Sequence, residues 1–310
     1  MLVALVVLVC FVGHDYQRII DGVSYWRVRE PIESIYLMYD RKRDKYGYAS
    51  RLNAKELAEA LAFAGQRPEQ VGVNPQSYDD VFATLYSVLR REVDGRGRRV
   101  LVDATSTTKE AYGAVVTVSL MFPGVSIYVV PPAERGWYVP DPESPSFEDW
   151  FRRVRSVRGL APQEIHLPGF RLERPSEDEE RVLMALEEHE GRADSIKSLI
   201  RWCGEDPSSP AVKNRFSRLV DKLVAKGMVA EGPAAKTKPI ALTSFGLVLA
   251  KALKAYYSQP PELKAAGLTP PVAGNTHGEA GRPSVNASGG WRQHGGTVPA
   301  IRSAPQAAYP

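Results

Sequence analysis

The sequence predicts a doubly wound α/β fold with a parallel sheet, followed by a smaller α+β domain and a disordered tail. Three observations support this prediction. Over residues 1–135, apolar runs of strand length alternate with helical patterns. Between residues 176 and 258, three helical patterns precede two short apolar segments and a further helix. From residue 259 to residue 310 the sequence is rich in Pro, Gly, Ala and Ser and has almost no periodic apolar pattern, which is typical of a disordered segment.

The composition is that of a globular protein. The chain has 310 residues, enough for two domains of ordinary size, with 44% hydrophobic and 25% charged residues. Its two cysteines, Cys10 and Cys203, exclude a disulfide framework and a zinc site built from several cysteines. So few cysteines are typical of a reducing compartment, and we therefore expect a cytoplasmic protein without a metal site.

The apolar run over residues 1–12 is the first predicted strand. It is shorter than the about 20 residues of a membrane-spanning helix, and it lacks the basic start and the cleavage site of a signal peptide. A central strand that is buried on both faces of a parallel sheet has this continuous apolar character. We therefore expect a strand and no membrane anchor, with a signal peptide as the minor alternative.

Five strands and four helices alternate in the first domain, residues 1–135. The strands are expected at residues 2–12, 34–39, 70–73, 99–102 and 125–130, and the helices at residues 16–25, 49–64, 78–93 and 109–121. This alternation predicts a parallel sheet with helices on both faces and right-handed crossovers. In the commonest strand order, 3-2-1-4-5, ligands bind in the crevice beyond the carboxyl ends of the first and fourth strands.

Two polar loops follow the first and fourth strands, at the two sides of that crevice. In the second of these loops, Thr107 and Glu110 stand in the register of a capping box. The free N–H groups of such a helix start attract anions. The alternative is a purely structural cap with a solvated lysine. We predict that a ligand is bound by Gly13, His14, Asp15, Thr105, Ser106, Thr107, Thr108 and Lys109.

Two large classes of enzyme are disfavoured. Gly13 is not followed by the second and third glycines of a dinucleotide-binding fingerprint, and the sequence has no P-loop motif. We therefore expect no nicotinamide or other resident cofactor, and we assign no catalytic residue. Residues 136–175 are expected to form a proline-rich connector with one short amphipathic helix at residues 147–157.

The second domain, residues 176–258, begins with a capping box at Ser176 and Glu179. Helical patterns follow at residues 177–190, 193–203 and 210–226, then two short strands at 228–231 and 240–243 and a helix at 244–257. Three helices, a two-stranded wing and a final helix predict a winged helix-turn-helix.

This second domain has two oppositely charged halves. Residues 176–207 contain 4 basic and 10 acidic residues, whereas residues 208–257 contain 9 basic and 2 acidic ones. A basic helix and wing suit double-stranded DNA, because the helix can reach base edges and the wing can contact phosphates. The alternative is a helical domain that binds protein. The residues that we expect to bind DNA are Lys213, Asn214, Arg215, Ser217 and Arg218 in the helix and Lys236 and Lys238 in the wing.

Residues 9–16 (VCFVGHDY) and 103–109 (DATSTTK) carry a resemblance to a known family. Together with the second domain, they resemble regulators that join a CRISPR-associated Rossmann fold (CARF) domain to a winged helix-turn-helix. That family often has a Thr-Gly-Gly-Thr-Lys type of sequence after the fourth strand. Here Ser106 and Thr107 replace both glycines and restrict the approach of a ligand to the backbone. The resemblance covers residues 1–257 and implies a Rossmann-like fold and a homodimer that binds a cyclic oligoadenylate in a pocket on its two-fold axis.

The resulting hypothesis is a CRISPR-associated, ligand-responsive transcriptional regulator with a role in antiviral defence. Cyclic oligoadenylate is its expected effector, and double-stranded DNA and a second copy of the chain are its expected partners. One alternative is a ring nuclease, an enzyme that cleaves the cyclic ligand, with His14 as a conceivable base. Another is a sensor that recruits a protein instead of DNA. The Arg-x4–6-His motif of the family's RNases does not occur in residues 176–257, which argues against RNase activity.

Overall fold

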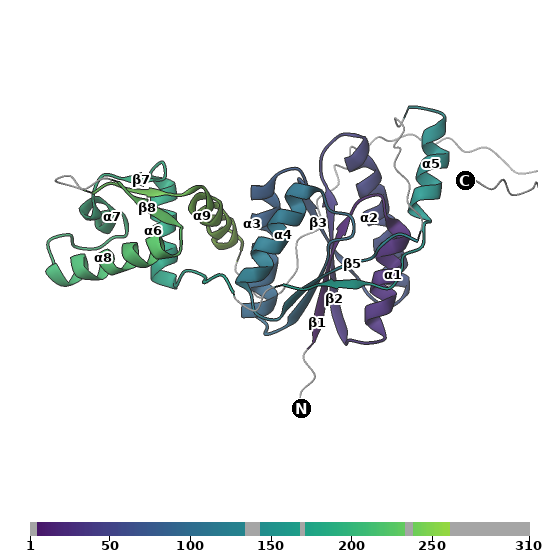
Figure 1. The fold of residues 1–310 in the computed structure, drawn as a ribbon, viewed down its shortest axis with the longest axis horizontal. Coiled ribbons are helices and arrows are strands. Elements are labelled where there is room, and N and C mark those ends of the chain that lie inside the picture. The colour runs from purple at the N-terminus through teal and green to yellow at the C-terminus, as the bar shows by residue number, and fades with distance from the viewer. Residues whose placement is uncertain (1–4, 134–142, 168–170, 233–237, 261–310) are drawn as a thin grey trace, which may run out of the picture. The chain divides into compact units, whose positions relative to one another are not determined.

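The computed structural model describes residues 5–133, 143–167, 171–232 and 238–260 (Figure 1). These residues all belong to one compact unit, Met1–Thr269. The predicted tail beyond residue 260 and the predicted DNA-binding residue Lys236 lie outside the described residues. The division of the chain into domains at residues 135 and 176 stays a prediction.

A six-stranded sheet forms the first part of the fold. The strands are β1 (Val6–Val12), β2 (Ile32–Asp40), β3 (Glu69–Val73), β4 (Arg99–Asp103), β5 (Val125–Val129) and β6 (Gln163–Ile165). Their order is β3-β2-β1-β4-β5-β6, and every neighbouring pair is parallel except β5 and β6. The predicted order of the first five strands is therefore confirmed. The antiparallel β6 was missed because a three-residue strand that is largely exposed has no apolar period to detect.

Helices cover both faces of this sheet. Figure 1 shows α1 (Tyr16–Arg27) and α2 (Lys45–Phe63) on one face, and α3 (Tyr78–Leu89) and α4 (Lys109–Met121) on the other. All seven residues of β1 are buried, and alternate ones enter two separate cores. Leu8 packs with the α1 and α2 side, and Val9 with the α3 and α4 side. The continuous apolar character of the first strand follows from this double burial.

Helix α4 begins at Lys109 as expected, but its cap differs from the prediction. Thr108 has the extended backbone of an N-cap residue, and its hydroxyl accepts the backbone N–H of Ala111 at 3.1 Å. The Thr107 hydroxyl instead donates to the carbonyl of Ala104 at 2.9 Å. The predicted capping box on Thr107 and Glu110 is therefore wrong by one residue, because the chain is still turning at Thr107.

Helix α5 (Ser146–Arg155) lies in the expected connector. Its residues Phe147, Trp150 and Phe151 are buried against Ala49 of α2, where they form a small apolar cluster of their own. Helix α2 itself begins four residues earlier than predicted, because the carboxylate of Asp44 accepts the backbone N–H of Gly47 at 2.8 Å and caps the helix there.

Four helices and three short strands make up the C-terminal part of the fold. They are α6 (Glu177–Glu188), β7 (Arg192–Ala193), α7 (Ile196–Trp202), α8 (Pro210–Ala225), β8 (Val229–Glu231), β9 (Ile240–Leu242) and α9 (Ser244–Tyr257). The strands form an antiparallel sheet in the order β7-β9-β8. The expected capping box is confirmed, since Glu179 accepts the Ser176 backbone N–H at 2.8 Å. The two-residue β7 was too short to predict.

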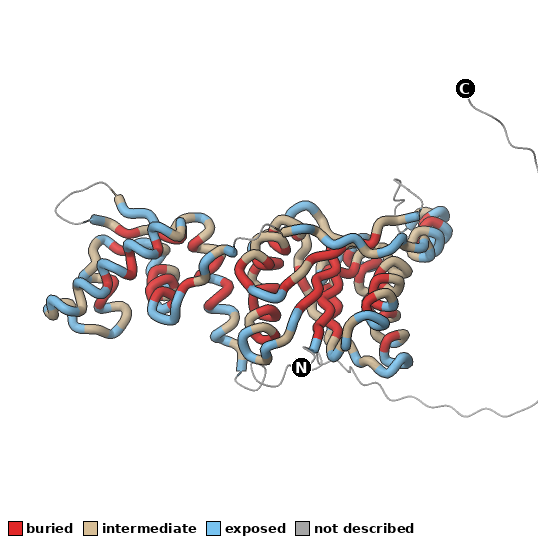
Figure 2. Tube along the Cα trace, turned by 60° about the horizontal axis from the view of Figure 1, so that its bottom comes forward, coloured by how far each residue is buried: buried red, intermediate tan, exposed pale blue. Residues whose placement is uncertain are grey.

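Helix α9 packs against α3 of the first part. The rings of Phe82 and Phe245 meet edge to face with centroids 6.1 Å apart. Helix α3 continues into a π-helical turn, η1 (Arg90–Asp94), whose Arg90 donates to both carboxylate oxygens of Glu180 at 2.7 and 3.0 Å. The Tyr257 hydroxyl donates to the same carboxylate at 2.5 Å. Figure 2 shows buried residues along the strands and on the inner sides of these helices.

Removal of either partner of this ion pair is expected to destabilise the protein strongly. The side chains of Arg90 and Glu180 are only 15% and 5% exposed, so Arg90→Ala leaves a buried carboxylate without its cation. Such truncations reduce the free energy of unfolding by about 3–5 kcal/mol. Urea denaturation measures the change. The control is Arg99→Ala, whose pair with Glu30 lies at the surface and contributes about 0–1 kcal/mol. Equal losses in the two variants would contradict the prediction.

Candidate functional site

A cavity of about 410 Å³ lies at the carboxyl edge of the sheet, where β1 and β4 end. This edge, at the point where the strand order reverses, is where doubly wound sheets bind their ligands. Seven of the eight predicted ligand-binding residues line the cavity, and Lys109 does not, because it is exposed in the first turn of α4. The seven are Gly13, His14, Asp15, Thr105, Ser106, Thr107 and Thr108. Ligand binding by them stays a prediction.

The two predicted loops contact each other directly. The Ser106 hydroxyl donates to Asp15 Oδ2 at 2.7 Å, and Arg18 Nη2 lies 2.5 Å from Asp15 Oδ1. A Cβ atom at Gly13 would lie 3.0 Å from Ser106 Cβ. Glycine is therefore needed at position 13 because the second loop passes so close to the first.

The hydroxyls of the second loop hold the shape of that loop. Thr107 donates to Ala104, Thr108 donates to the carbonyl of Pro75, and Thr105 Oγ1 accepts the Val130 backbone N–H at 2.9 Å. The hydroxyl protons of Thr107 and Thr108 are therefore used within the protein, and backbone N–H groups at the start of α4 are further donors for an anion. Within the described residues, the N–H groups of Lys109 and Glu110 have no acceptor, as expected for the first turn of a helix.

His14 presents a neutral imidazole at the cavity. Its ring lies between Tyr46 and Trp150, with centroid distances of 5.7 and 5.4 Å. Its Nδ1 atom is buried and has no hydrogen-bond partner among the described residues. Burial lowers the pKa of His14, and the nearby Asp15 opposes this shift only in part. A neutral imidazole nitrogen can accept a hydrogen bond from a ligand.

Two further loops line the cavity, and sequence reasoning did not assign these loops to the site. Asp40, Lys42, Asp44 and Tyr46 come from the loop between β2 and α2 and the start of that helix, and Gln76 follows β3. The signal was available, because a charged run follows a buried strand whose carboxyl end meets the same edge of the sheet. The prediction considered only the two loops at the reversal point.

Asp103 lies beneath the second loop, at the end of β4, and is fully buried. Its Oδ1 accepts the Thr105 backbone N–H at 2.9 Å, whereas its Oδ2 and the buried hydroxyl of Tyr128 have no hydrogen-bond partner among the described residues. Burial raises the pKa of Asp103 to about 6, although hydrogen bonding from Thr105 opposes this effect.

Replacement of Asp103 by asparagine is expected to change how stability depends on pH. The folded state binds the Asp103 proton more tightly than the unfolded state does. The protonated carboxyl therefore makes its full contribution to the stability of the folded protein below pH 4, and this contribution is lost as pH rises through about 6. The difference between about 6 and the ordinary value of 3.8 corresponds to about 3 kcal/mol. The free energy of unfolding of Asp103→Asn minus that of the wild type should therefore grow by about 2 kcal/mol between pH 4 and pH 7, because the unfolded carboxyl is already partly ionised at pH 4. A constant difference in urea denaturation over this range would refute it.

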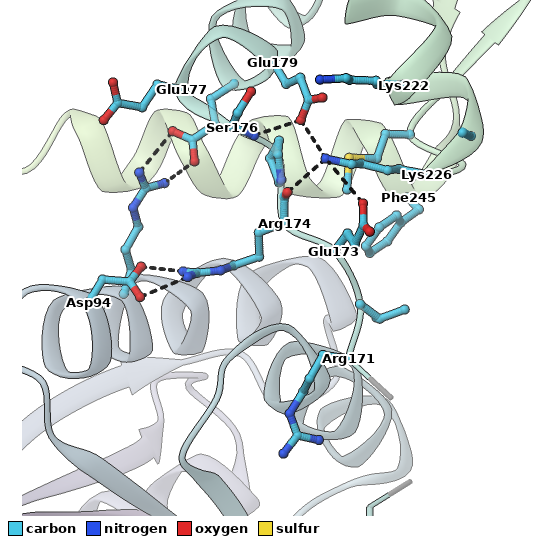
Figure 3. Close-up of a pocket in the computed structure, with 16 residues that line it drawn as sticks. Asp94, Arg171, Glu173, Arg174, Ser176, Glu177, Glu179, Lys222, Lys226 and Phe245 are labelled. Atoms are coloured by element: carbon cyan, nitrogen blue, oxygen red, sulfur yellow. Dashed lines mark hydrogen bonds and ion pairs between the residues drawn. The ribbon is translucent and has the colours of Figure 1, made fainter. Parts of the chain in front are cut away.

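A larger cavity, of about 920 Å³, lies beside η1 and α6 (Figure 3). Figure 3 shows several of its charged side chains paired with one another, among them Arg174 with Asp94 and Lys226 with Glu179. Lys226 lies 2.7 Å from Glu179 and 3.8 Å from Glu173. The smaller cavity is the better candidate for a ligand, because it lies at the edge of the sheet where the strand order reverses and where doubly wound folds bind their ligands.

Helix α8 is polar and basic on one face. Asn214, Arg215, Ser217 and Arg218 are exposed, and Lys213 is half-buried. Two of the predicted DNA-binding cations have carboxylate partners, since Arg215 pairs with Glu205 and Lys238 lies 3.4 Å from Glu231. The apolar face consists of Phe216, Leu219, Val220 and Leu223. Val224 is 39% exposed and is not part of this buried face.

Two features, a metal-ligand cluster and a membrane-spanning helix, are absent from the described part of the chain. There, no cluster of three or more His, Cys, Asp or Glu side chains has the arrangement of a metal site. None of the helices in the same residue ranges combines the length and the apolar character that crossing a bilayer requires.

No protein-family model and no curated protein sequence matches the chain. Solved structures do match it. Csm6 from Enterococcus italicus, bound to cyclic hexa-2′-fluoro-hexa-dAMP, is 10% identical with a TM-score of 0.38, over 72% of this chain and 56% of that one. Protein VC1899 from Vibrio cholerae is 12% identical with a TM-score of 0.32, over 81% and 66%. A type III CRISPR defence DNA nuclease activated by cyclic oligoadenylate is 13% identical with a TM-score of 0.32, over 75% and 37%.

The chain thus spans from 37% to 66% of the length of these three structures. All three TM-scores are below 0.5, and likenesses of this degree carry no argument about function. The function is therefore argued from the cavity, from α8 and from the resemblance in the two loops.

Proposed function

We propose that this protein is a transcriptional regulator that binds a cyclic oligoadenylate in its 410 Å³ cavity and DNA through its C-terminal helices. The observation that carries the proposal is the convergence of the loops after β1 and β4 on this cavity, beside the N-terminus of α4. The same loops carry the sequence resemblance to CARF domains. The C-terminal elements and the basic face of α8 support the DNA-binding half of the proposal.

The chemistry of the cavity suits a nucleotide that carries phosphates. Its volume of about 410 Å³ lies within the range of about 300–1,000 Å³ that is typical of small-molecule sites. The unpaired N–H groups at the start of α4 can donate to phosphate oxygens, and the neutral His14 can accept from an amino or hydroxyl group. A cyclic oligonucleotide with two-fold symmetry would be shared by two copies of the chain. An isologous homodimer then places the two cavities around one ligand.

The C-terminal part of the chain acts as a winged helix-turn-helix in this proposal. The order of α6, β7, α7, α8, β8, β9 and α9 supports this assignment. Helix α8 is the recognition helix, because its exposed face has side chains that reach bases or phosphates, and the hairpin of β8 and β9 is the wing. In a dimer, two such helices bind half-sites about 34 Å apart or a multiple of that distance.

A series of contacts through α3 supports coupling between the two sites. Asp80, at the start of α3, pairs with Arg41 of the loop after β2 at 2.9 Å. Its neighbour Asp79 lies 3.7 Å from Lys251 of α9. Ligand that strengthens or weakens the Arg41–Asp80 pair would therefore act on the helix that packs against α9. Binding of ligand and of DNA would change each other's affinity by the same factor.

Calorimetric titration with cyclic tri-, tetra- and hexa-adenylate tests the ligand half of the proposal. We expect one ring size to bind with a stoichiometry of one ligand per two chains, and linear oligoadenylates of the same length to bind more weakly. Native mass spectrometry of the same samples should show the dimer. If the protein binds none of the three cyclic oligoadenylates, the proposal that it binds such a ligand is wrong.

Ring cleavage is the second candidate function, and His14 is the observation that favours it. A neutral imidazole beside the cavity can remove the proton of a ribose 2′-hydroxyl as its oxygen attacks the adjacent phosphorus. The bond from phosphorus to the 5′-oxygen of the next nucleotide breaks, which leaves a 2′,3′-cyclic phosphate and a 5′-hydroxyl that takes its proton from the imidazolium or from water. Chromatography of the cyclic ligand after prolonged incubation distinguishes the two functions. Linear products that disappear in His14→Ala would support the ring nuclease, whereas intact ligand would support a sensor.

A further inference from the structure

Lys42 is the cation that the cavity offers to a phosphate. Of the lysines and arginines in the described ranges, it is the one that lines the cavity. Three carboxylates share the cavity with it: Asp15 pairs with Arg18, Asp40 accepts the Lys42 backbone N–H at 2.8 Å, and Asp44 caps α2 and lies 3.2 Å from the Lys42 ammonium. An anion that enters the cavity would meet the ammonium of Lys42 rather than that of Lys109, which does not line it.

The backbone of Lys42 is held in place by its neighbours. The Arg51 guanidinium donates to the carbonyl of Lys42 and, at 3.3 Å, to that of Asp40. Gly47 passes so close that a Cβ atom there would lie 2.0 Å from the Lys42 carbonyl oxygen. The loop between β2 and α2 thus has a fixed shape before any ligand arrives, which reduces the entropy lost on binding.

The side chain of Lys42 retains a donor for a ligand. Its ammonium donates to Gln76 Oε1 and lies 3.2 Å from Asp44 Oδ2. A lysine ammonium has three N–H donors, so these two contacts leave one. The side chain is also 33% exposed, and both of its partners line the same cavity. The two contacts orient the ammonium and leave it reachable.

Tyr46 provides an aromatic ring in the same cavity, and the Lys45 ammonium lies 5.5 Å from its centroid. The Tyr46 side chain lines the cavity and is nevertheless 44% exposed. Its ring centroid lies 5.7 Å from that of His14, with the two planes at 59°. A partly exposed ring in a cavity that also offers a cation can stack on a nucleobase, and stacking does not depend on the identity of the base.

We propose that the loop between β2 and α2 forms part of the ligand site, with Lys42 binding a phosphate of the nucleotide and Tyr46 stacking on one of its bases. This inference rests on the proposed ligand site and extends it to residues outside the two loops that carry the sequence resemblance.

The test compares cavity-lining residues with matched neighbours on the same segment. Lys42→Ala and Tyr46→Ala are each expected to weaken binding of cyclic tetra- or hexa-adenylate by about tenfold or more, as measured by calorimetry. Tyr46→Phe should bind nearly as the wild type does, because it keeps the ring. The controls are Arg43→Ala and Tyr48→Ala, exposed residues that do not line the cavity, and both should stay within twofold of the wild type.

The outcomes separate this inference from the proposed function. Wild-type protein that binds the cyclic ligand while Lys42→Ala and Tyr46→Ala bind it equally well would overturn the inference alone. Wild-type protein that binds no cyclic oligoadenylate would overturn both. Thermal unfolding of each variant confirms that it is folded, and a loss of binding equal to that of Arg43→Ala would identify a general charge effect and contradict the role of Lys42.

Discussion

A leucine in place of Gly13 is expected to abolish ligand binding, with the dissociation constant for the cyclic oligoadenylate raised by at least 100-fold. The reason is the close approach of the two loops, in which a Cβ atom at position 13 would lie 3.0 Å from Ser106 Cβ and 3.3 Å from the Ser106 carbonyl oxygen. A larger side chain must push the loops apart or enter the cavity that they line. Either change removes the geometry on which hydrogen bonds to a ligand depend.

The control for this prediction is Gly113→Ala. Gly113 lies in α4, and the nearest atoms to a Cβ there are 3.9 Å away on the Tyr78 ring, so alanine fits without displacement. We expect its ligand affinity to equal that of the wild type. Calorimetry measures both variants, and circular dichroism shows whether Gly13→Leu keeps the fold. A folded Gly13→Leu protein with wild-type affinity would show that the ligand binds elsewhere.

The double variant Lys213→Ala plus Arg218→Ala is expected to lose about 10- to 100-fold in DNA affinity at 100 mM salt. These two residues lie on the exposed and half-exposed side of α8, and no described carboxylate pairs with either of them, in contrast to Arg215. Each phosphate contact that is lost reduces the slope of log K against log salt by about 0.9. A series of anisotropy titrations at several salt concentrations should therefore give a slope that is smaller by about 1.8.

A matched pair of arginines on another helix is the control for charge. Arg152 and Arg153 are both exposed on α5, so Arg152→Ala plus Arg153→Ala removes the same net charge away from α8. We expect that double variant to bind DNA with nearly the wild-type affinity and slope. Equal losses in the two double variants would mean that net charge, rather than the face of α8, determines the affinity. No loss in either would favour a basic surface that binds protein.

The parts of the fold that could be predicted from sequence are those with strong and uniform burial. Strand β1 is buried on both faces, so its apolar run was unambiguous, and the strand order followed from the alternation of strands and helices. Strands β6 and β7 have three and two residues and are too short to show a period. Their pairing depends on tertiary contacts that no local pattern encodes.

The candidate site was predictable only in part, for two physical reasons. The polar loops at the point where the strand order reverses could be placed from topology. Topology alone therefore predicted that residues 13–15 lie next to residues 105–108. The direction in which each side chain points could not be predicted, because it depends on the residue at which the following helix begins. Lys109 is the first residue of α4 and projects away from the cavity, whereas Lys42 lies in it because Arg51 and Gly47 fix the preceding turn.

Asp103 illustrates a property that sequence cannot supply. Its position after an apolar strand was evident, but its raised pKa comes from complete burial beneath the Thr105 loop. The same residue type at Asp44 has its pKa lowered, mainly because the carboxylate accepts the Gly47 backbone N–H. Two aspartates at the same edge of the sheet therefore differ in proton affinity through their environment alone.

The measurement that tests the central claim most directly is the DNA affinity of the protein with and without cyclic oligoadenylate. The DNA is a duplex selected by the protein from a random library, and fluorescence anisotropy gives the dissociation constant at each ligand concentration. We expect saturating ligand to change this constant by about 5- to 150-fold, and DNA to change the ligand affinity by the same factor. Binding of both partners with a coupling factor of one would contradict the account of a ligand-responsive regulator.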